Sequence, residues 1–454
     1  MRLRHFRTRA SRGLRIGRLT ARNGARFVGT RLRGVGADDA RKAALNEQFA
    51  IRTAQDVARE LGQMKGAMMK AGQLIGFIIE SLPDDAQQAL ATLQADAPPM
   101  APALATQVVT EELGDPRSVF LDWGETPIAA ASIGQVHKAV TRDGRVVAVK
   151  VQYPGIADAL GADLANVEVL YSLMTSFALK GIDAKAVVEE VRLRMIDELD
   201  YRLEATNQVE FADYYRDHPF IHIPALIPEL STERVLTSDW VDGLSFQSFM
   251  DQSTPEARQR AGEIIWRFSQ HSILRLGAFN GDPHPGNYRF APDGSVTFLD
   301  FGLVKRWTPG EWDHLEPSLH GILGRDPERL VRDMETIGFL PVGHGLDALA
   351  VFDYVSAPYR PYLADEFTYT REYVKDTIGR ILDIKGPHAP VIEKLNLPVS
   401  FVMLDRVVWG ISALLGKLGA HGPWRSMMNE YLIDGPPSTP LGRLEADWLA
   451  STKP

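Results

Sequence analysis

The chain has 454 residues, of which 45% are hydrophobic and 24% charged, a composition typical of a folded soluble protein with two or three domains. It contains no cysteine, which excludes disulfides, thiolate zinc sites and cysteine nucleophiles. The net charge of −8 is unevenly distributed, because residues 1–35 carry eleven Arg and no acidic residue and the remainder therefore carries −19. A basic arm on an acidic body predicts a polyanionic surface as the partner of the arm.

The arm, residues 1–37, is predicted to be a basic amphipathic helix. Apolar residues between Leu3 and Leu32 fall on one face at helical spacing, most of the Arg lie elsewhere, and glycines interrupt the pattern. Three interpretations stay open: a helix on an anionic membrane, a solvated tail, and an organelle transit peptide. We therefore expect a protein of the cytoplasm or of a membrane surface, or of an organelle matrix if this segment is a transit peptide.

Residues 38–115 are predicted to form a helical extension, since they are rich in Ala, Gln and Glu and contain no Pro before Pro83. Within them lies Lys70-Ala71-Gly72-Gln73, where a glycine interrupts an apolar helix at a cost of about 1 kcal/mol relative to Ala. The glycine indicates a close backbone approach. Taken alone, the pattern favours a helix–helix crossing with Lys70 reaching outward.

Residues 116–244 change to short strands separated by turns. A turn of small residues, 129–134, precedes a strand, the hairpin signal Asp143-Gly144, and a second strand that carries Lys150 among valines. This order suits a loop folded over phosphates with a cation beneath it, and the alternative is a lysine on an edge strand. The helical segment that follows is dense in acidic residues around 198–204, which on a helix face are ordinarily solvated.

Residues 245–454 begin with a helix predicted over 255–276, which leads into a stretch of polar ligands. Asp282 and Asn287 stand in Asp-x4-Asn spacing, and Asp300-Phe301-Gly302 begins thirteen residues past Asn287. A β-hairpin is predicted between them. Two carboxylates and an amide supply oxygen ligands for Mg²⁺ and an Asp to orient the attacking group, as a Mg²⁺–triphosphate site requires. The alternative is loop acids without chemistry.

Helices are expected from Gly302 to the end of the chain. No run of 18 or more apolar residues occurs, so no transmembrane helix is predicted. The nearest candidate, residues 401–418, is interrupted by Asp405, Arg406 and Lys417, and we expect it to be a buried helix.

The order of these parts is that of a protein-kinase-like nucleotide site. Over about residues 40–430 the chain resembles the UbiB family of atypical kinases, also called the AarF or coenzyme-Q-kinase-like family. Four signatures carry the resemblance: 70–73, 129–137, 198–205, and 282–287 with 300–302. The resemblance implies an α+β, two-lobed protein-kinase-like fold with a helical N-terminal extension (38–115), an N-lobe (116–244) and a helix-rich C-lobe (245–454).

The resemblance also implies catalytic and metal-binding roles. Lys150 would contact the phosphates of ATP and pair with Glu204, and Asp282 would be the catalytic-loop aspartate. Asn287 and Asp300 would hold Mg²⁺.

A further group of residues would cover the nucleotide. Lys70 and Gln73 would lie over the site and meet Glu198 and Asp200. The phosphate-covering loop would consist of Ala129, Ala130, Ala131, Ser132, Ile133 and Gly134.

The chain departs from ordinary protein kinases in its catalytic loop, which reads Asn280-Gly281-Asp282 and carries His284 where many kinases have Lys. No Ala-Pro-Glu and no long activation loop follow Gly302, and a lid of Lys70 and Gln73 would leave little room for a protein substrate. We expect an ATPase or an atypical kinase acting on a small or lipid-like molecule. A protein kinase acting in trans and a nucleotide-gated scaffold with negligible turnover are the alternatives.

The partners implied are ATP with Mg²⁺, a lipid or isoprenoid-quinone precursor, and an anionic membrane surface through residues 1–35. Family resemblance links the chain to isoprenoid-quinone biosynthesis or lipid homeostasis. No nucleic-acid partner is expected.

Overall fold

The computed structural model describes residues 41, 101–131, 133–157, 189, 192–193, 196–383, 386–396 and 399–452. The chain divides into two compact units, residues 1–99 with 155–178 and residues 100–154 with 179–454. Nearly all of the described residues belong to the second unit, to which the following description applies. The basic arm, Lys70, Gln73 and Ser132 lie outside the described residues.

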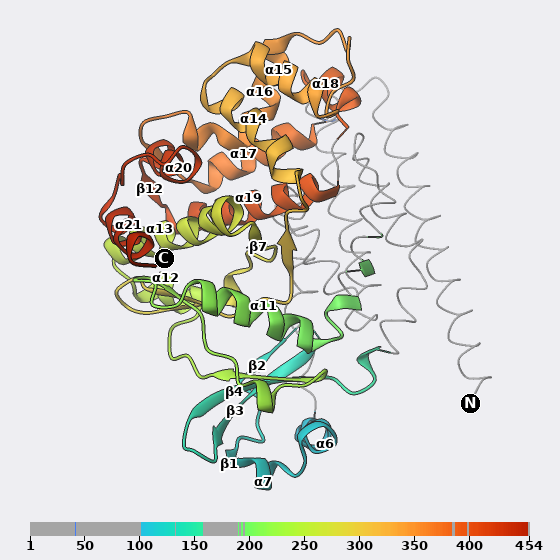
Figure 1. The fold of residues 1–454 in the computed structure, drawn as a ribbon, viewed down its shortest axis with the longest axis vertical. Coiled ribbons are helices and arrows are strands. Elements are labelled where there is room, and N and C mark those ends of the chain that lie inside the picture. Colours follow the sequence, from blue (N-terminus) through green and yellow to red (C-terminus); the bar gives the residue numbers. More distant parts are fainter. Residues whose placement is uncertain are drawn as a thin grey trace, which may run out of the picture. The chain divides into compact units, whose positions relative to one another are not determined.

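A five-stranded antiparallel sheet lies at one end of this unit (Figure 1). Strand β3 pairs with β1, β2 and β4, and β4 pairs on its other side with β6. The hairpin predicted at Asp143-Gly144 is confirmed, because Val140 pairs with Val146 and Gly144 has a φ of +89°, which glycine adopts without strain. The strands are β1 (Phe120–Trp123), β2 (Ala129–Ala130), β3 (Gly134–Thr141), β4 (Val146–Gln152) and β6 (Val235–Asp239).

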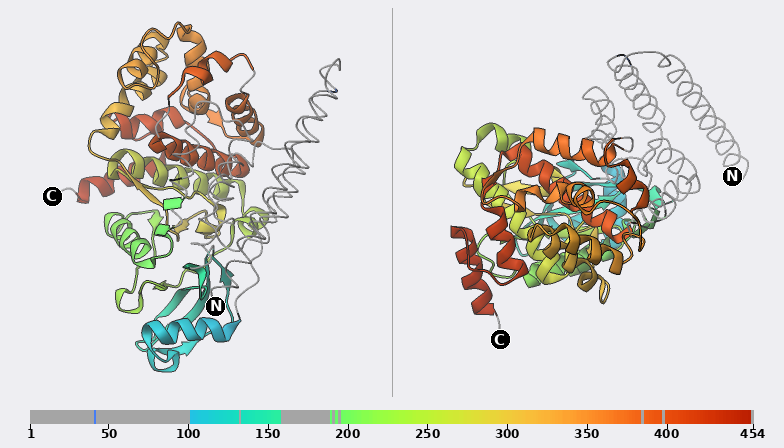
Figure 2. Two further views of the ribbon diagram at one scale, coloured as in Figure 1. Left: turned by 90° about the vertical axis from the view of Figure 1, so that its right-hand side faces the viewer. Right: turned by 90° about the horizontal axis from the view of Figure 1, so that it is seen from above.

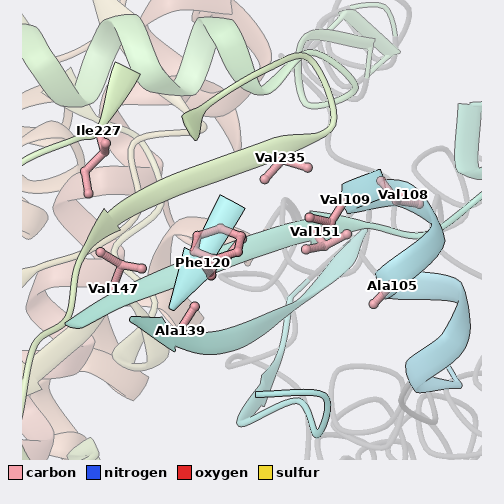
Figure 3. Packing of buried hydrophobic residues seen from close by; sticks show 10 residues of the cluster. Ala105, Val108, Val109, Phe120, Ala139, Val147, Val151, Ile227 and Val235 are labelled. Carbon is pink, nitrogen blue, oxygen red and sulfur yellow. The ribbon is translucent and has the colours of Figure 1, made fainter. Parts of the chain in front are cut away.

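Helix α6 (Pro102–Leu113) packs on this sheet and completes its core (Figure 3). Val108 and Val109 are at most 1% exposed, and burial of each contributes about 1.5–3 kcal/mol. They join Phe120 and the valines of β4 and β6 in one cluster. Arg234, next to β6, fixes the helix from outside through Glu112 at 2.8 Å and Glu111 at 2.9 Å.

Helix α6 falls within residues 38–115, which we expected to be a separate extension. Its buried face belongs to the core of the sheet, and the division between the two compact units comes at residue 99, before the helix begins. The helix is therefore grouped with the sheet. The remaining boundaries of the four-part division stay predictions.

Helix α11 (Tyr201–Tyr214) lies between the sheet and the helix-rich part of the unit (Figures 1 and 2). The Asp200 carboxylate caps its first turn by accepting the Arg202 N–H at 3.0 Å. The Tyr201 N–H donates to the Glu233 carbonyl oxygen at 2.9 Å, which joins the start of the helix to the chain just before β6.

The helix predicted over 255–276 is found as α13 (Pro255–His271), continued by a π-helical turn over Ser272–Leu276. A π turn is often found at functional sites, and this one ends at Gly277, with a φ of +70°. Strand β7 (Ala278–Asn280) then leads into residues 281–287, which are named the catalytic loop after the sequence resemblance. The predicted hairpin is confirmed as β8 (Tyr288–Phe290) and β9 (Val296–Phe298), and β10 (Val304–Arg306) returns to pair with β7.

Helices dominate the rest, so the expected α+β class, with a sheet-bearing and a helix-rich part, is confirmed. The remaining elements are α7 (Pro116–Val119), β5 (Ile221–His222), η1 (Pro228–Leu230), α12 (Phe246–Gln252), η3 (Pro285–Asn287), α14 (Glu311–Leu323), α15 (Pro327–Thr336), α16 (Ala348–Val355), η4 (Ala357–Tyr362), β11 (Phe367–Thr368), α17 (Arg371–Leu382), α18 (Ala389–Lys394), α19 (Val399–Leu418), β12 (His421–Gly422), α20 (Trp424–Leu432) and α21 (Pro440–Thr452).

Arg267 anchors the C-terminal helices to α13. Its guanidinium is fully buried and bonds Glu263 and Glu430 at 2.8 Å and Glu445 at 3.0 Å. Because a buried cation without partners is strongly destabilising, this network fixes α20 and α21 on α13, the helix that precedes the catalytic loop.

Helix α19 matches the buried helix predicted over residues 401–418. Among the residues described, no helix combines the length and the apolar character needed to cross a membrane. The helix packs on the catalytic loop at Gly410, where an added Cβ would lie 2.2 Å from Pro283 Cγ. Because Gly410 has no side chain, α19 can pack closely against Pro283. This contact supports the loop at Asp282, the residue before Pro283.

We predict that Gly410→Ala lowers the free energy of unfolding by about 1–3 kcal/mol, since the new methyl group must displace α19 or the loop. Gly379→Ala on α17 is the matched control, because a Cβ there meets nothing within 4 Å. That variant should be unchanged or more stable by up to about 1 kcal/mol, because Ala favours helix over Gly. Urea denaturation of both variants measures the difference, and equal stabilities would contradict the packing described.

Candidate nucleotide site

Lys150 lies at the centre of the candidate site. Strand β4 carries it between β3 and β6, with Val136 and Leu236 as its register partners, so it is not on an edge strand. Its Nζ donates to Glu204 Oε1 at 2.7 Å and Oε2 at 2.8 Å. It also contacts Asp300 Oδ2 at 3.4 Å. The structure thus brings together a strand lysine, a helix glutamate and the aspartate that follows β9, as the resemblance implied.

The charges of this group are strongly coupled, because all three side chains are largely withdrawn from water. The side chains of Lys150, Glu204 and Asp300 are 18%, 6% and 26% exposed. Burial alone would lower the pKa of Lys150, but the Asp300 and Glu204 carboxylates raise it well above its ordinary value. Burial raises the pKa of Glu204 to about 7, against the attraction of Lys150 and with the repulsion of Asp300.

Two carboxylates share one ammonium here, so the group carries net negative charge when all three are ionised. An added divalent cation would relieve that excess. Among the described residues no cluster of three or more His, Asp or Glu forms a metal cage by itself. Mg²⁺ in nucleotide sites is usually held by one or two protein ligands together with substrate phosphates.

The catalytic loop holds Asp282 and Asn287 against each other. Asn287 Nδ2 donates to the Asp282 carbonyl oxygen at 3.0 Å and to Asp282 Oδ2 at 3.1 Å. Both bonds use the amide nitrogen, so the amide oxygen of Asn287, the atom type that ligates Mg²⁺, lies outside this contact. His284 closes the turn between them by accepting the Gly286 N–H through Nδ1 at 3.1 Å.

Asn280 joins the catalytic loop to Asp300. Its Oδ1 accepts the Asp282 N–H at 2.8 Å, and its Nδ2 donates to the Asp300 carbonyl oxygen. The sequence marked Asn280 only as a departure from the His-Arg-Asp pattern. Its function is visible in the structure alone, where one amide spans the two loops that carry the aspartates.

The small-residue turn is a tight hairpin. Ala129 and Ala130 pair with Val136 and Gln135 of β3, and the Ala131 N–H donates to the Gly134 carbonyl oxygen at 2.8 Å. A Cβ at Gly134 would lie 2.3 Å from the Val151 carbonyl oxygen, so the turn rests directly on the end of β4, next to Lys150.

Tyr201 is a second residue that sequence reasoning missed. Its side chain is buried, its ring lies 5.0 Å from Lys150 Nζ, and its hydroxyl lies 2.9 Å from the position of a Cβ at Gly134. It thus fills the space between the lysine and the turn. Its place within the signature 198–205 was the available signal.

The other acidic residues near α11 differ in their surroundings. Both Asp200 oxygens contact the Arg202 guanidinium, at 2.8 Å each, in addition to the helix cap. Glu198 lies near enough to add to the raised pKa of Glu204. The predicted contacts of Glu198 and Asp200 with Lys70 and Gln73 fall outside the described residues, and so does Ser132 of the turn.

Comparison with known proteins agrees with this geometry. A family model described as the ABC1 atypical kinase-like domain matches residues 92–334, more than half of the chain. The Arabidopsis thaliana protein ACTIVITY OF BC1 COMPLEX KINASE 1, chloroplastic, is 32% identical over 303 residues, which are 64% of this chain and 43% of that protein. A probable serine/threonine-protein kinase, abkA, of Dictyostelium discoideum is 30% identical over 311 residues, 64% of this chain and 54% of its own length.

A solved structure adds a longer match. Rv3197 of Mycobacterium tuberculosis, in complex with erythromycin, is 32% identical with a TM-score of 0.63, over 86% of this chain and 98% of that one. The chain spans less than half the length of the Arabidopsis relative named above. From the family match and the convergence of Lys150, Glu204 and Asp300, we conclude that the chain belongs to the ABC1 atypical kinase-like family, the UbiB/AarF family that its sequence resembles.

Proposed function

We propose that the chain binds Mg-ATP and transfers or hydrolyses its terminal phosphate, as an atypical kinase or ATPase. The observation that supports this proposal most strongly is the contact of Lys150 with both Glu204 and Asp300. A strand lysine fixed by a helix glutamate supplies a point charge for phosphate oxygens. An aspartate at the same point supplies a metal ligand next to those oxygens.

Each residue has a distinct task in this proposal. Lys150 binds the α- and β-phosphates, and Glu204 holds it in place. Asp300 and Asn287 hold Mg²⁺, which when bound neutralises charge on the phosphates. Asp282 orients the attacking hydroxyl or water and accepts its proton, and the 129–134 turn covers the phosphates. Lys70 and Gln73 would close the site from above, next to Glu198 and Asp200.

The acceptor we propose is water or a small, lipid-like molecule. Helix α14 begins at Glu311, and β10 ties residues 304–306 back to β7. Segment 303–310 therefore offers little free chain for docking a peptide. A lipid or isoprenoid-quinone precursor is the acceptor that the family resemblance favours. Phosphorylation of proteins is the second candidate, favoured by the name of the Dictyostelium relative.

We predict that Lys150→Met and Asp300→Asn each abolish the ATP-induced rise in melting temperature, because the first removes the proposed contact with the phosphates and the second removes the proposed metal ligand. At an ATP concentration 100 times the Kd, the wild type should gain about 2.7 kcal/mol of stability. Differential scanning fluorimetry with Mg-ATP measures the shift. Lys138→Met on β3, where the lysine lies over Trp240 instead, and Asp293→Asn in the β8–β9 turn are the matched controls.

The outcomes separate the candidates. A full ATP shift in both site variants would reject the site assignment. Phosphate release with and without anionic liposomes and quinone-precursor mimics then tests turnover, with Lys70→Ala as a probe of the lid. Binding without any release would favour a nucleotide-gated scaffold, and transfer of labelled phosphate to peptides, lost in Asp282→Asn, would favour a protein kinase.

We also propose that residues 1–35 bring the chain to an anionic membrane. Eleven Arg without an acidic residue support this, while the chloroplastic Arabidopsis relative ACTIVITY OF BC1 COMPLEX KINASE 1 supports the alternative of a transit peptide. We predict that deletion of residues 2–33 reduces co-sedimentation with anionic liposomes and that salt reduces it in the full chain. Equal sedimentation of both chains would reject a role at the membrane.

A further inference from the structure

Asparagine amides hold the backbone of Asp300-Phe301-Gly302 from two sides. Asn280 Nδ2 donates to the Asp300 carbonyl oxygen, and Asn207 Nδ2 on α11 donates to the next carbonyl oxygen, that of Phe301, at 2.9 Å. Asn207 also accepts Arg306 Nη2 through Oδ1 at 2.9 Å. A single side chain on α11 therefore contacts the backbone after β9 and the end of β10.

The residues of α11 that face this segment lie on one side of the helix. Glu204, Asn207 and Phe211 are spaced three and four residues apart, which places them in line along one face. The Phe211 ring packs on that of the fully buried Phe301, with centroids 5.0 Å apart. A Cβ at Gly302 would lie 3.4 Å from Glu204 Oε2, so the segment runs directly beneath this face.

Arg306 secures the contact from the other end. It also bonds Glu210, one turn along α11, and its backbone pairs with Ala278 of β7. The side chains of Arg306 and Glu210 are 45% and 39% exposed, so their ion pair contributes little by itself. Asn207 is half-buried and donates to the Phe301 carbonyl oxygen. Its hydrogen bond therefore contributes more than the ion pair to holding α11 against Asp300-Phe301-Gly302.

We propose that Asn207, secured by Arg306, is a positioning residue that fixes α11 against Asp300-Phe301-Gly302, so that Glu204 and Asp300 reach Lys150 together. This inference rests on the proposed function. Under this proposal, the fold itself holds α11 and Asp300-Phe301-Gly302 in the arrangement that nucleotide binding needs. Modification of segment 303–310 is not required to assemble it.

Asn207→Leu tests this proposal, because leucine keeps the approximate size of asparagine and removes both hydrogen bonds. We expect affinity for Mg-ATP to fall about tenfold, a loss of roughly one well-placed hydrogen bond. Affinity for ATP in EDTA should change much less, because Asp300 acts through the metal. Asn207→Asp, which keeps the acceptor for Arg306 but loses the donor to Phe301, should resemble Asn207→Leu. Calorimetric titration measures these affinities.

Graded and control variants separate positioning from a general loss of structure. Arg306→Ala should weaken Mg-ATP binding only slightly, Arg306→Lys should restore it, and adding Arg306→Ala to Asn207→Leu should have little further effect. Thr206→Ala is the matched control, since the Thr206 hydroxyl donates to the Arg202 carbonyl oxygen within α11 at 2.8 Å. Should Asn207→Leu not fold, Asn207→Asp, which keeps the acceptor for Arg306 and loses only the donor to Phe301, carries the test.

Hydrogen exchange gives a readout that needs no nucleotide. Peptides covering residues 300–306 should exchange faster in Asn207→Leu than in Thr206→Ala. Wild-type affinity for Mg-ATP together with unchanged exchange in Asn207→Leu would overturn the proposal. If the wild type fails to bind Mg-ATP at all, the proposed function is wrong, and the exchange comparison still decides whether Asn207 holds the segment.

Discussion

The structure depends on one ammonium group, Lys150 Nζ, held between the carboxylates of Glu204 and Asp300. Removing a charge of this kind from water costs several kcal/mol, and a buried charge that loses its partner destabilises the fold strongly. The three residues come from β4, α11 and the segment after β9. The five-stranded sheet, α11 and the segment after β9 must therefore come together around the Lys150 ammonium group. The candidate site lies where they meet.

Contacts between uncharged groups hold the elements around Lys150 in place. Asn280 joins the two loops that carry Asp282 and Asp300, and Asn207 joins α11 to the carbonyl after Asp300. Gly410 lets α19 rest on the residue that follows Asp282. These contacts are all made between groups of the protein itself. Under the proposed function they would preorganise the site for the charge of a nucleotide and its metal, as electrostatic catalysis requires.

Much of this arrangement was predictable, because the strand, hairpin and helix patterns are local and the order of the polar signatures is specific. The hairpin at Asp143-Gly144 and the helix before the catalytic loop follow from such local signals, whereas the pairing of Lys150 with Glu204 was implied by the family resemblance. Asn207 and Asn280 were missed because a hydrogen bond to a distant backbone carbonyl leaves no periodic trace in the sequence. Helix α6 was assigned to the extension because its apolar residues do not indicate which partner buries them.

The most direct test of the central claim is a crystal structure of the chain with Mn²⁺ in place of Mg²⁺ and a non-hydrolysable ATP analogue. Anomalous scattering distinguishes Mn²⁺ from water and lighter ions without the metal having been placed beforehand. The account predicts a peak within bonding distance of Asp300 and of the amide oxygen of Asn287, with Lys150 Nζ on the phosphates and still paired with Glu204. A nucleotide bound elsewhere, or metal density away from Asp300, would contradict it.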